Sequence, residues 1–138
     1  MWLPDQFYQF GLNAYGYVGD GGLAIHRGDV PIAKTENPEI YRTERFNFTG
    51  YRFRVPNGTY TVKLHWAEGF RFGTQIAFDV AVEGETLLKN YDFHKDAGAF
   101  RTAYVRDLPG IRVTDGELAL DFSPRRHFRV HGIEVVPE

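Results

Sequence analysis

The feature that most constrains the fold is a strict alternation of apolar with polar or small residues between positions 60 and 67. The apolar positions are Tyr60, Val62, Leu64 and Trp66, and the intervening ones are Thr61, Lys63, His65 and Ala67. Successive side chains of a β-strand point to opposite faces, so this period of two predicts a half-buried strand. Pro56-Asn57-Gly58 precedes it, and because Asn-Gly tolerates positive φ we expect the chain to reverse there.

Similar patterns continue along the rest of the chain. We expect further strands at 51–55, 76–82, 86–90, 102–108, 111–113, 118–122 and 128–136. Turns are expected at Glu83-Gly84 and at Thr114-Asp115-Gly116, the second as a hairpin. Residues 1–30 follow neither the period of a strand nor that of a helix, so we expect ordered loops there. Only 36–45 suits a short helical turn. Short strands separated by turns predict one all-β domain over 1–138, an antiparallel β-sandwich or barrel.

The composition excludes several classes of partner. A net charge of −2 without blocks of like charge argues against nucleic acid, which binds a concentrated basic face. No apolar run approaches the ~18 residues of a membrane span, and the first residues lack the features of a signal peptide. Because cysteine is absent, a disulfide frame and a thiolate metal site are excluded. Such a chain fits the cytoplasm or a secreted bacterial protein.

Motifs for catalysis are missing. The sequence contains no Gly-x-Ser-x-Gly, no His-Glu-x-x-His and no phosphate-binding glycine loop. His127 and His131 are four residues apart, which on a strand places them at opposite ends of one face. Glu68 could face Asp79 or Asp92 as a pair for glycoside cleavage, but solvated or salt-bridged carboxylates are the favoured interpretation. We therefore expect no enzymatic activity, no cofactor and no metal.

Aromatic and cationic residues gather in the expected loops and strand ends. Sugars present flat C–H faces and rings of hydroxyls, so a site for them combines exposed aromatic rings with polar side chains. The residues that supply both are Tyr15, Tyr17, Phe46, Phe70-Arg71-Phe72 and Arg125-Arg126-His127. Aromatics packed under their own loops are the alternative, which composition leaves open.

An ordered series of short motifs resembles the malectin and malectin-like domains. The motifs are Ile32-Ala33-Lys34-Thr35, Tyr41-Arg42-Thr43-Glu44-Arg45, Asn57-Gly58-Thr59-Tyr60, Leu64-His65-Trp66-Ala67-Glu68 and Phe78-Asp79-Val80. The resemblance covers nearly the whole chain and is specific as a set. It implies a jelly-roll-like β-sandwich that binds a glycan and does no chemistry, in a family that occurs in bacterial glycoside hydrolases and plant receptor kinases.

The resemblance also implies which residues contact the glycan. An early Tyr-Gly matches Tyr15, and the aromatic after Thr-Glu-Arg is Phe46, where malectin has tyrosine. The aromatic pair after Ala-Glu-x matches Phe70 and either Arg71 or Phe72. The loop that gives malectin an acidic contact falls here at Arg125-Arg126-His127, which replaces an acceptor with donors. The expected carbohydrate site is Tyr15, Phe46, Phe70, Arg71, Phe72, Arg126 and His127.

Two functions from different classes are compatible with this sequence. The first is a carbohydrate-binding module for an oligosaccharide or polysaccharide, carried beside a glycoside hydrolase domain in a secreted or periplasmic protein. The second is a structural or protein-interaction module whose sugar site has decayed. The family's usual first strand, Ile-Asn-Ala-Gly-Gly, does not precede Trp2, so we also expect an unpaired edge strand that recruits a second copy into a homodimer.

Overall fold

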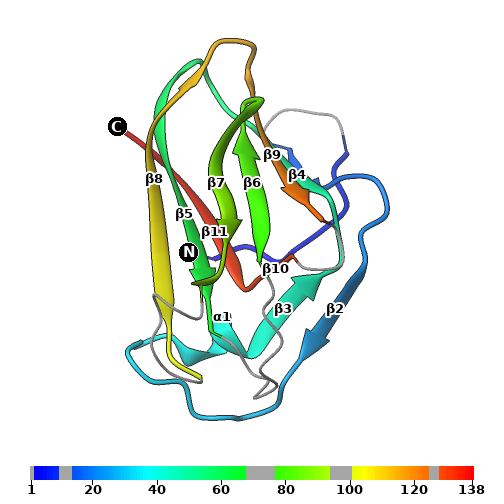
Figure 1. The fold of residues 1–138 in the computed structure, drawn as a ribbon, viewed down its shortest axis with the longest axis vertical. Helices are drawn as coiled ribbons and strands as arrows, with labels where there is room; N and C mark the ends of the chain where they lie inside the picture. Colours follow the sequence, from blue (N-terminus) through cyan, green and yellow to red (C-terminus); the bar gives the residue numbers. More distant parts are fainter. Residues whose placement is uncertain (1, 10–13, 68–76, 94–100, 125–127) are drawn as a thin grey trace.

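The computed structural model describes residues 2–9, 14–67, 77–93, 101–124 and 128–138. The strands pair antiparallel and form two facing layers (Figure 1). This architecture confirms the predicted all-β sandwich.

One layer is a five-stranded sheet, and two smaller sheets complete the fold. The five-stranded order is β1 (Tyr15–Tyr17), β4 (Gly50–Arg54), β9 (Glu117–Ser123), β6 (Phe78–Val82) and β7 (Glu85–Tyr91). The facing sheet has the order β11 (Gly132–Pro137), β5 (Gly58–Trp66) and β8 (Tyr104–Val113). The third sheet has the order β10 (Arg129–Val130), β3 (Thr43–Phe46) and β2 (Leu23–His26), at one end of the sandwich (Figure 1). The helix α1 (Pro38–Arg42) precedes β3 and confirms the helical turn expected within 36–45.

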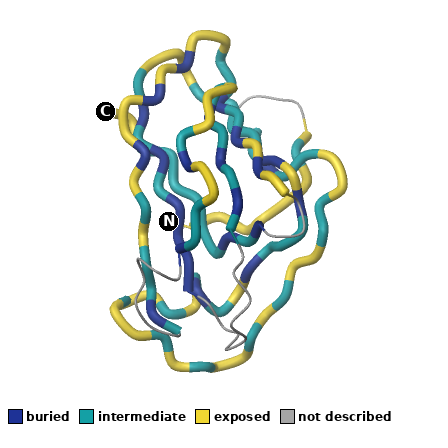
Figure 2. The backbone as a smooth tube through the Cα atoms, in the orientation of Figure 1, coloured by how far each residue is buried: buried dark blue, intermediate teal, exposed yellow. Residues whose placement is uncertain are grey.

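The predicted buried face of β5 lies in the centre of the core. Val62, Leu64 and Trp66 are each 0% exposed, and the Trp66 ring stacks on Phe93 at 5.2 Å. The facing layer contributes Phe78, Val80, Val82, Leu118, Leu120 and Phe122. Alternation in β6 and β9 therefore predicted the correct faces, and the buried residues of the layers meet in the middle of the molecule (Figure 2).

The other face of β5 differs from the prediction near its C-terminal end. Thr61 and Lys63 are partly exposed, but His65 is only 7% exposed. Two distant segments cover it: the Tyr41 hydroxyl of α1 lies 2.7 Å from His65 Nδ1, and the Trp2 ring packs edge-on at 5.0 Å. A local period of two predicts which residues share a face but not what covers that face.

Three segments differ from the expected order of elements. Residues 1–30 contain β1 and β2, so they are not loops throughout. The expected strands 102–108 and 111–113 form one strand, β8; Pro109 is tolerated because β8 lies at a sheet edge, where its missing N–H is not needed. The expected closing strand 128–136 is divided into β10 and β11, which belong to different sheets.

The turns between β-strands were predicted with mixed success. The Glu83-Gly84 turn is confirmed, with φ of 51° and 80°. The turn at Thr114-Asp115-Gly116 joins β8 to β9 in different sheets, so it is not a hairpin. Pro56-Asn57-Gly58 also crosses between layers, without positive φ in its Asn-Gly pair. The Asn57 side chain instead accepts a hydrogen bond from Gly116 N–H at 2.8 Å, which ties the two connections together.

Candidate functional site

Phe46 lies at the end of β3, in a row of paired residues that crosses the sheet of β10, β3 and β2. Its register partners are Leu23 of β2 and Arg129 of β10. Directly paired residues of antiparallel strands share a face, so we call these three residues the Phe46 row. Phe46 is partly exposed and Leu23 is 60% exposed. The row places an aromatic ring beside an apolar side chain and a guanidinium, which are groups that a sugar-binding surface uses.

Most of the other predicted contacts lie outside the described residues. They are Phe70, Arg71, Phe72, Arg126 and His127. The described residues that flank them come together, because Trp66 Nε1 donates to the Arg129 carbonyl at 2.6 Å and Asn47 N–H donates to the Phe128 carbonyl at 3.1 Å. Trp66 and Phe128, which are described residues near the ends of the undescribed ranges, therefore lie next to the Phe46 row.

Tyr15 lies away from that row. It pairs with Phe53 across β1 and β4, and its hydroxyl donates to the Pro4 carbonyl at 2.9 Å. Tyr17, two residues later, is the tyrosine beside β3, because the Arg45 guanidinium covers its ring at 3.8 Å from the centroid. Sequence reasoning included Tyr17 among the aromatic candidates but assigned the family contact to Tyr15.

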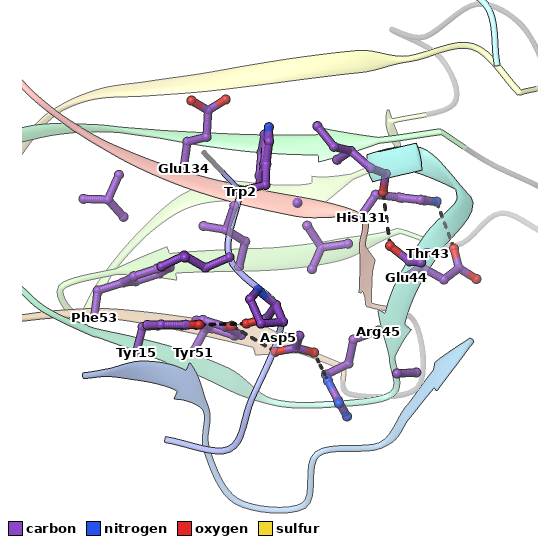
Figure 3. Close-up of a pocket in the computed structure, with 18 of the residues that line it drawn as sticks. Trp2, Asp5, Tyr15, Thr43, Glu44, Arg45, Tyr51, Phe53, His131 and Glu134 are labelled. Carbon is purple, nitrogen blue, oxygen red and sulfur yellow. Dashed lines mark hydrogen bonds and ion pairs between the residues drawn. The ribbon is translucent and has the colours of Figure 1, made fainter. Parts of the chain in front are cut away.

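A groove of about 770 Å³ runs along β11 and contains Tyr15. In Figure 3, Tyr15, Tyr51 and Phe53 lie on one side of it, while Trp2 and Glu134 lie on the other, next to β11. Figure 3 also shows the N-terminal segment crossing between these two sides. Phe46 does not line this groove, so Tyr15 and Phe46 belong to two separate surfaces.

Two anchors hold the N-terminal segment in the groove. Asp5 accepts a hydrogen bond from the Tyr51 hydroxyl at 2.9 Å and another from Arg45 Nε at 2.5 Å. Burial and the nearby Asp5 carboxylate raise the pKa of Tyr51, which keeps it a neutral donor. The Trp2 ring packs so closely over Gly132 that a β-carbon there would lie 2.9 Å from it.

A charged cluster is buried at one end of the groove. Glu44 Oε2 lies 3.1 Å from His131 Nε2, and both side chains are 1% exposed. The other carboxylate oxygen is paired with Arg27. Burial opposes ionisation of Glu44, but the contacts with His131 and Arg27 outweigh it and lower its pKa to about 2. Glu44 is therefore a fixed negative charge and not a proton donor near neutral pH.

A second histidine links three elements on the outer face of β5. His65 Nε2 lies 2.6 Å from Glu134 Oε1 of β11, and Nδ1 is bonded to Tyr41 of α1. Burial lowers the pKa of His65, although Glu134 opposes this effect. The neutral ring accepts from the Tyr41 hydroxyl and donates to Glu134, so it connects α1, β5 and β11 as a structural link.

Of the two described carboxylates considered for catalysis, Asp79 and Asp92, the first is engaged in hydrogen bonds within the fold. Asp79 accepts hydrogen bonds from Asn90 N–H at 2.7 Å and from Lys89 Nζ at 3.3 Å, and the first of these contributes most to lowering its pKa. Glu68, its suggested partner, lies outside the described residues.

Across the described ranges, no group of three potential ligand side chains is arranged to hold a metal ion. The same ranges contain no helix long and apolar enough to cross a membrane.

Comparison with known protein sequences gives one family. A family model described as "Malectin domain" matches residues 2–134. Malectin-B of Xenopus laevis is 33% identical over 112 residues, which cover 76% of this chain and 38% of that protein. A probable LRR receptor-like serine/threonine-protein kinase of Arabidopsis thaliana is 30% identical over 82 residues, covering 51% of this chain and 8% of the kinase. The chain therefore spans well under half the length of these relatives.

Solved structures share the fold over most of the chain. A β-glucuronidase of Bacteroides uniformis has a TM-score of 0.82 and 26% sequence identity, with 99% of this chain and 15% of that chain covered. The ANXUR1 extracellular domain of Arabidopsis thaliana has a TM-score of 0.70, 16% identity and coverage of 88% and 39%. The second similarity concerns the fold alone.

Proposed function

The chain belongs to the malectin domain family, and on that premise we propose that it is a non-catalytic carbohydrate-binding module. The glycan binds at the end of the sandwich that carries the Phe46 row, and the family match over residues 2–134 supports this role. The proposed contacts are Phe46, Phe70, Arg71, Phe72, Arg126 and His127. Because Tyr15 lines the groove instead, Tyr17 is the better candidate for the tyrosine of this site.

The observation that carries the proposal is the exposure of the Phe46 row. An apolar surface in water is unfavourable unless a partner covers it part of the time. A sugar ring stacked on Phe46 would cover its apolar face, and arginine side chains nearby would donate to the hydroxyls. The donors Arg126 and His127 stand in the loop where the family supplies an acidic contact, so a different sugar from that of malectin is expected.

We further propose that the module accompanies a glycoside hydrolase. The Bacteroides uniformis β-glucuronidase contains this fold in 15% of its chain and is 26% identical to it. A small sandwich carried beside a catalytic domain would hold the polymer near the enzyme and raise the local substrate concentration. A secreted or periplasmic parent protein is consistent with that role.

Glycan binding by two matched phenylalanine variants tests the proposed site. The probes are oligosaccharides that contain glucose, xylose, galactose or glucuronic acid. Phe46→Ala should weaken binding by roughly 1–2 kcal/mol, about tenfold or somewhat more, with little change in Tm because Phe46 is partly exposed. Phe53→Ala, in the groove, should leave the affinity unchanged. Loss of binding in Phe53→Ala alone would place the glycan in the groove instead.

The groove favours a second candidate function, as a protein-interaction module. Glu138 N–H donates to the Thr59 carbonyl of β5, and alternate residues of an antiparallel strand face the same neighbour. Ile133 and Val135 therefore direct their main-chain groups away from β5, and no strand in the described part of the chain pairs with that edge of β11. An edge beside an apolar groove suits an added strand, including one from a second copy.

A further inference from the structure

A hollow of about 320 Å³ lies where β5 begins and β8 ends, at the opposite end of β5 from the Phe46 row (Figure 1). β5 has nine residues, and its last one, Trp66, is bonded to Arg129 of that row. At about 3.3 Å per residue, the hollow and the row are therefore on the order of 25 Å apart. We call it the Arg112 hollow, and it is lined by Asn57, Gly58, Thr59, Arg112, Val113 and Thr114.

The guanidinium of Arg112 is exposed and has no partner within the described residues. The other arginines of the described ranges all interact with neighbouring groups: Arg27, Arg42, Arg45, Arg52, Arg54, Arg101, Arg106 and Arg129. Arg112 therefore differs from them in keeping all the N–H donors of its side chain available to a ligand.

Two hydroxyls and an amide line the hollow beside this guanidinium. Thr59 pairs directly with Arg112 across β5 and β8, so their side chains share a face, and Thr114 follows β8. Asn57 Oδ1 accepts from Gly116 N–H at 2.8 Å, which leaves the Nδ2 donors of the amide free of that contact. None of the residues that line the hollow is acidic, so its polar side chains favour an anionic ligand.

The frame of the hollow is fixed by hydrogen bonds between the two connections that border it. Val55 N–H donates to the Gly116 carbonyl at 3.1 Å, in addition to the bond between Gly116 and Asn57. The Tyr60 hydroxyl donates to the Pro56 carbonyl at 2.6 Å, and Tyr60 is buried in the core. A ligand therefore meets donors whose main chain is already ordered, which lowers the cost of binding.

Two carboxylates lie close to the hollow in the chain, and both have other partners. Glu138 Oε2 accepts from Gly110 N–H at 2.6 Å, and Asp115 Oδ1 accepts from Glu117 N–H at 3.2 Å. Neither carboxylate forms an ion pair with Arg112. Their charges reduce the attraction for an anion, so we expect an affinity that depends on direct contacts with Arg112 and falls with added salt.

We propose that the Arg112 hollow is a second binding site, which takes the carboxylate of an acidic sugar. The planar guanidinium can donate two parallel hydrogen bonds to a carboxylate. The hydroxyls of Thr59 and Thr114 and the amide of Asn57 suit the hydroxyls of the same sugar. The volume of about 320 Å³ is at the lower end of the roughly 300–1,000 Å³ of ligand sites, which favours a single sugar unit. The site does not depend on glycan binding at the Phe46 row.

The test is an NMR titration of the whole chain at low salt with three probes. They are an oligosaccharide of glucuronic acid, a glucose oligosaccharide of the same length, and sodium sulfate. The acidic oligosaccharide should shift the amide signals of Thr59, Arg112 and Thr114, and the glucose oligosaccharide should not. Arg112→Ala should weaken this binding roughly tenfold to a hundredfold, the effect of losing a hydrogen-bonded charge, and Arg112→Lys should weaken it less. Lys34→Ala removes the same charge at an exposed position outside the hollow and should bind like the wild type.

Three results would overturn the proposal. They are equal shifts with the glucose oligosaccharide, equal weakening in Arg112→Ala and Lys34→Ala, and sulfate binding as tight as that of the acidic oligosaccharide, which would indicate a general anion site. The amide signals of Leu23 and Phe46 report on the Phe46 row in the same spectra. Shifts confined to Thr59, Arg112 and Thr114 would support the second site while counting against glycan binding at the Phe46 row.

Discussion

At the scale of single residues, Trp66 tests the packing of the core. Its indole is 0% exposed, stacks on Phe93 and donates to the Arg129 carbonyl. Trp66→Ala should therefore lower the free energy of unfolding by about 3–5 kcal/mol. Trp2→Ala is the matched control, because Trp2 is 41% exposed and should cost less. Urea denaturation that gives equal losses for both variants would contradict this account of the core.

Glu44 makes a separate prediction for acid stability. Its pKa is about 2 in the folded protein, below its ordinary value of 4.5. A carboxylate with a lowered folded pKa stabilises the fold fully above its unfolded pKa, and this contribution is lost as the pH falls from 4.5 towards 2. Glu44→Gln should therefore flatten the decline of Tm in that window, whereas Glu36→Gln, at an exposed position, should retain it. An unchanged slope in Glu44→Gln would be the contrary result.

Single residues also show where sequence reasoning reaches its limit. Trp66 could be assigned to the core because its neighbours alternate with it along one strand. The burial of His65 depends on Tyr41 and Trp2, which reach it from other elements. Tyr15 and Tyr17 have the same local context, a glycine between two tyrosines, so the sequence could not show that one lines a groove and the other lies under Arg45.

At the scale of elements, long alternating segments were predicted well and sheet membership was not. The pattern in β5, β6 and β9 spans at least five residues, which suffices to identify a strand and its buried face. β1 and β2 contain three and four residues, too few for a period to be recognised. Which strands pair depends on contacts far apart in sequence, and for that reason the connection at Thr114-Asp115-Gly116 was mistaken for a hairpin.

The docking of the N-terminal segment on β11 gives a prediction about elements. A β-carbon at Gly132 would lie 2.9 Å from the Trp2 ring, closer than such contacts allow. Gly132→Ala should displace Trp2 and make residues 2–9 more sensitive to limited proteolysis. Gly58→Ala is the control, because its added carbon meets only Tyr60 at an ordinary 3.8 Å. Equal digestion of the two variants would show that the contact with Gly132 does not hold the segment.

At the scale of the whole molecule, the open edge of β11 makes a prediction about assembly. We expect the protein to dimerise with increasing concentration through this edge, because its outward main-chain groups need partners. Val136→Lys adds a charge to the edge and should shift the protein to monomer, whereas Val105→Lys on β8, the opposite edge of the same sheet, should not. Light scattering over a wide concentration range measures this, and a wild-type monomer throughout would refute it.

The placement of the two ends of the described chain has a mechanical consequence. Trp2 is packed on Gly132, where β11 begins, and Glu138 follows Pro137, where β11 ends. Tension applied between residues 2 and 138 would therefore pull along β11 and load its hydrogen bonds to β5 together, in shear. Bonds loaded in parallel resist far more force than bonds opened one after another. Extension between these two positions would therefore meet the hydrogen bonds between β11 and β5 before the core opens.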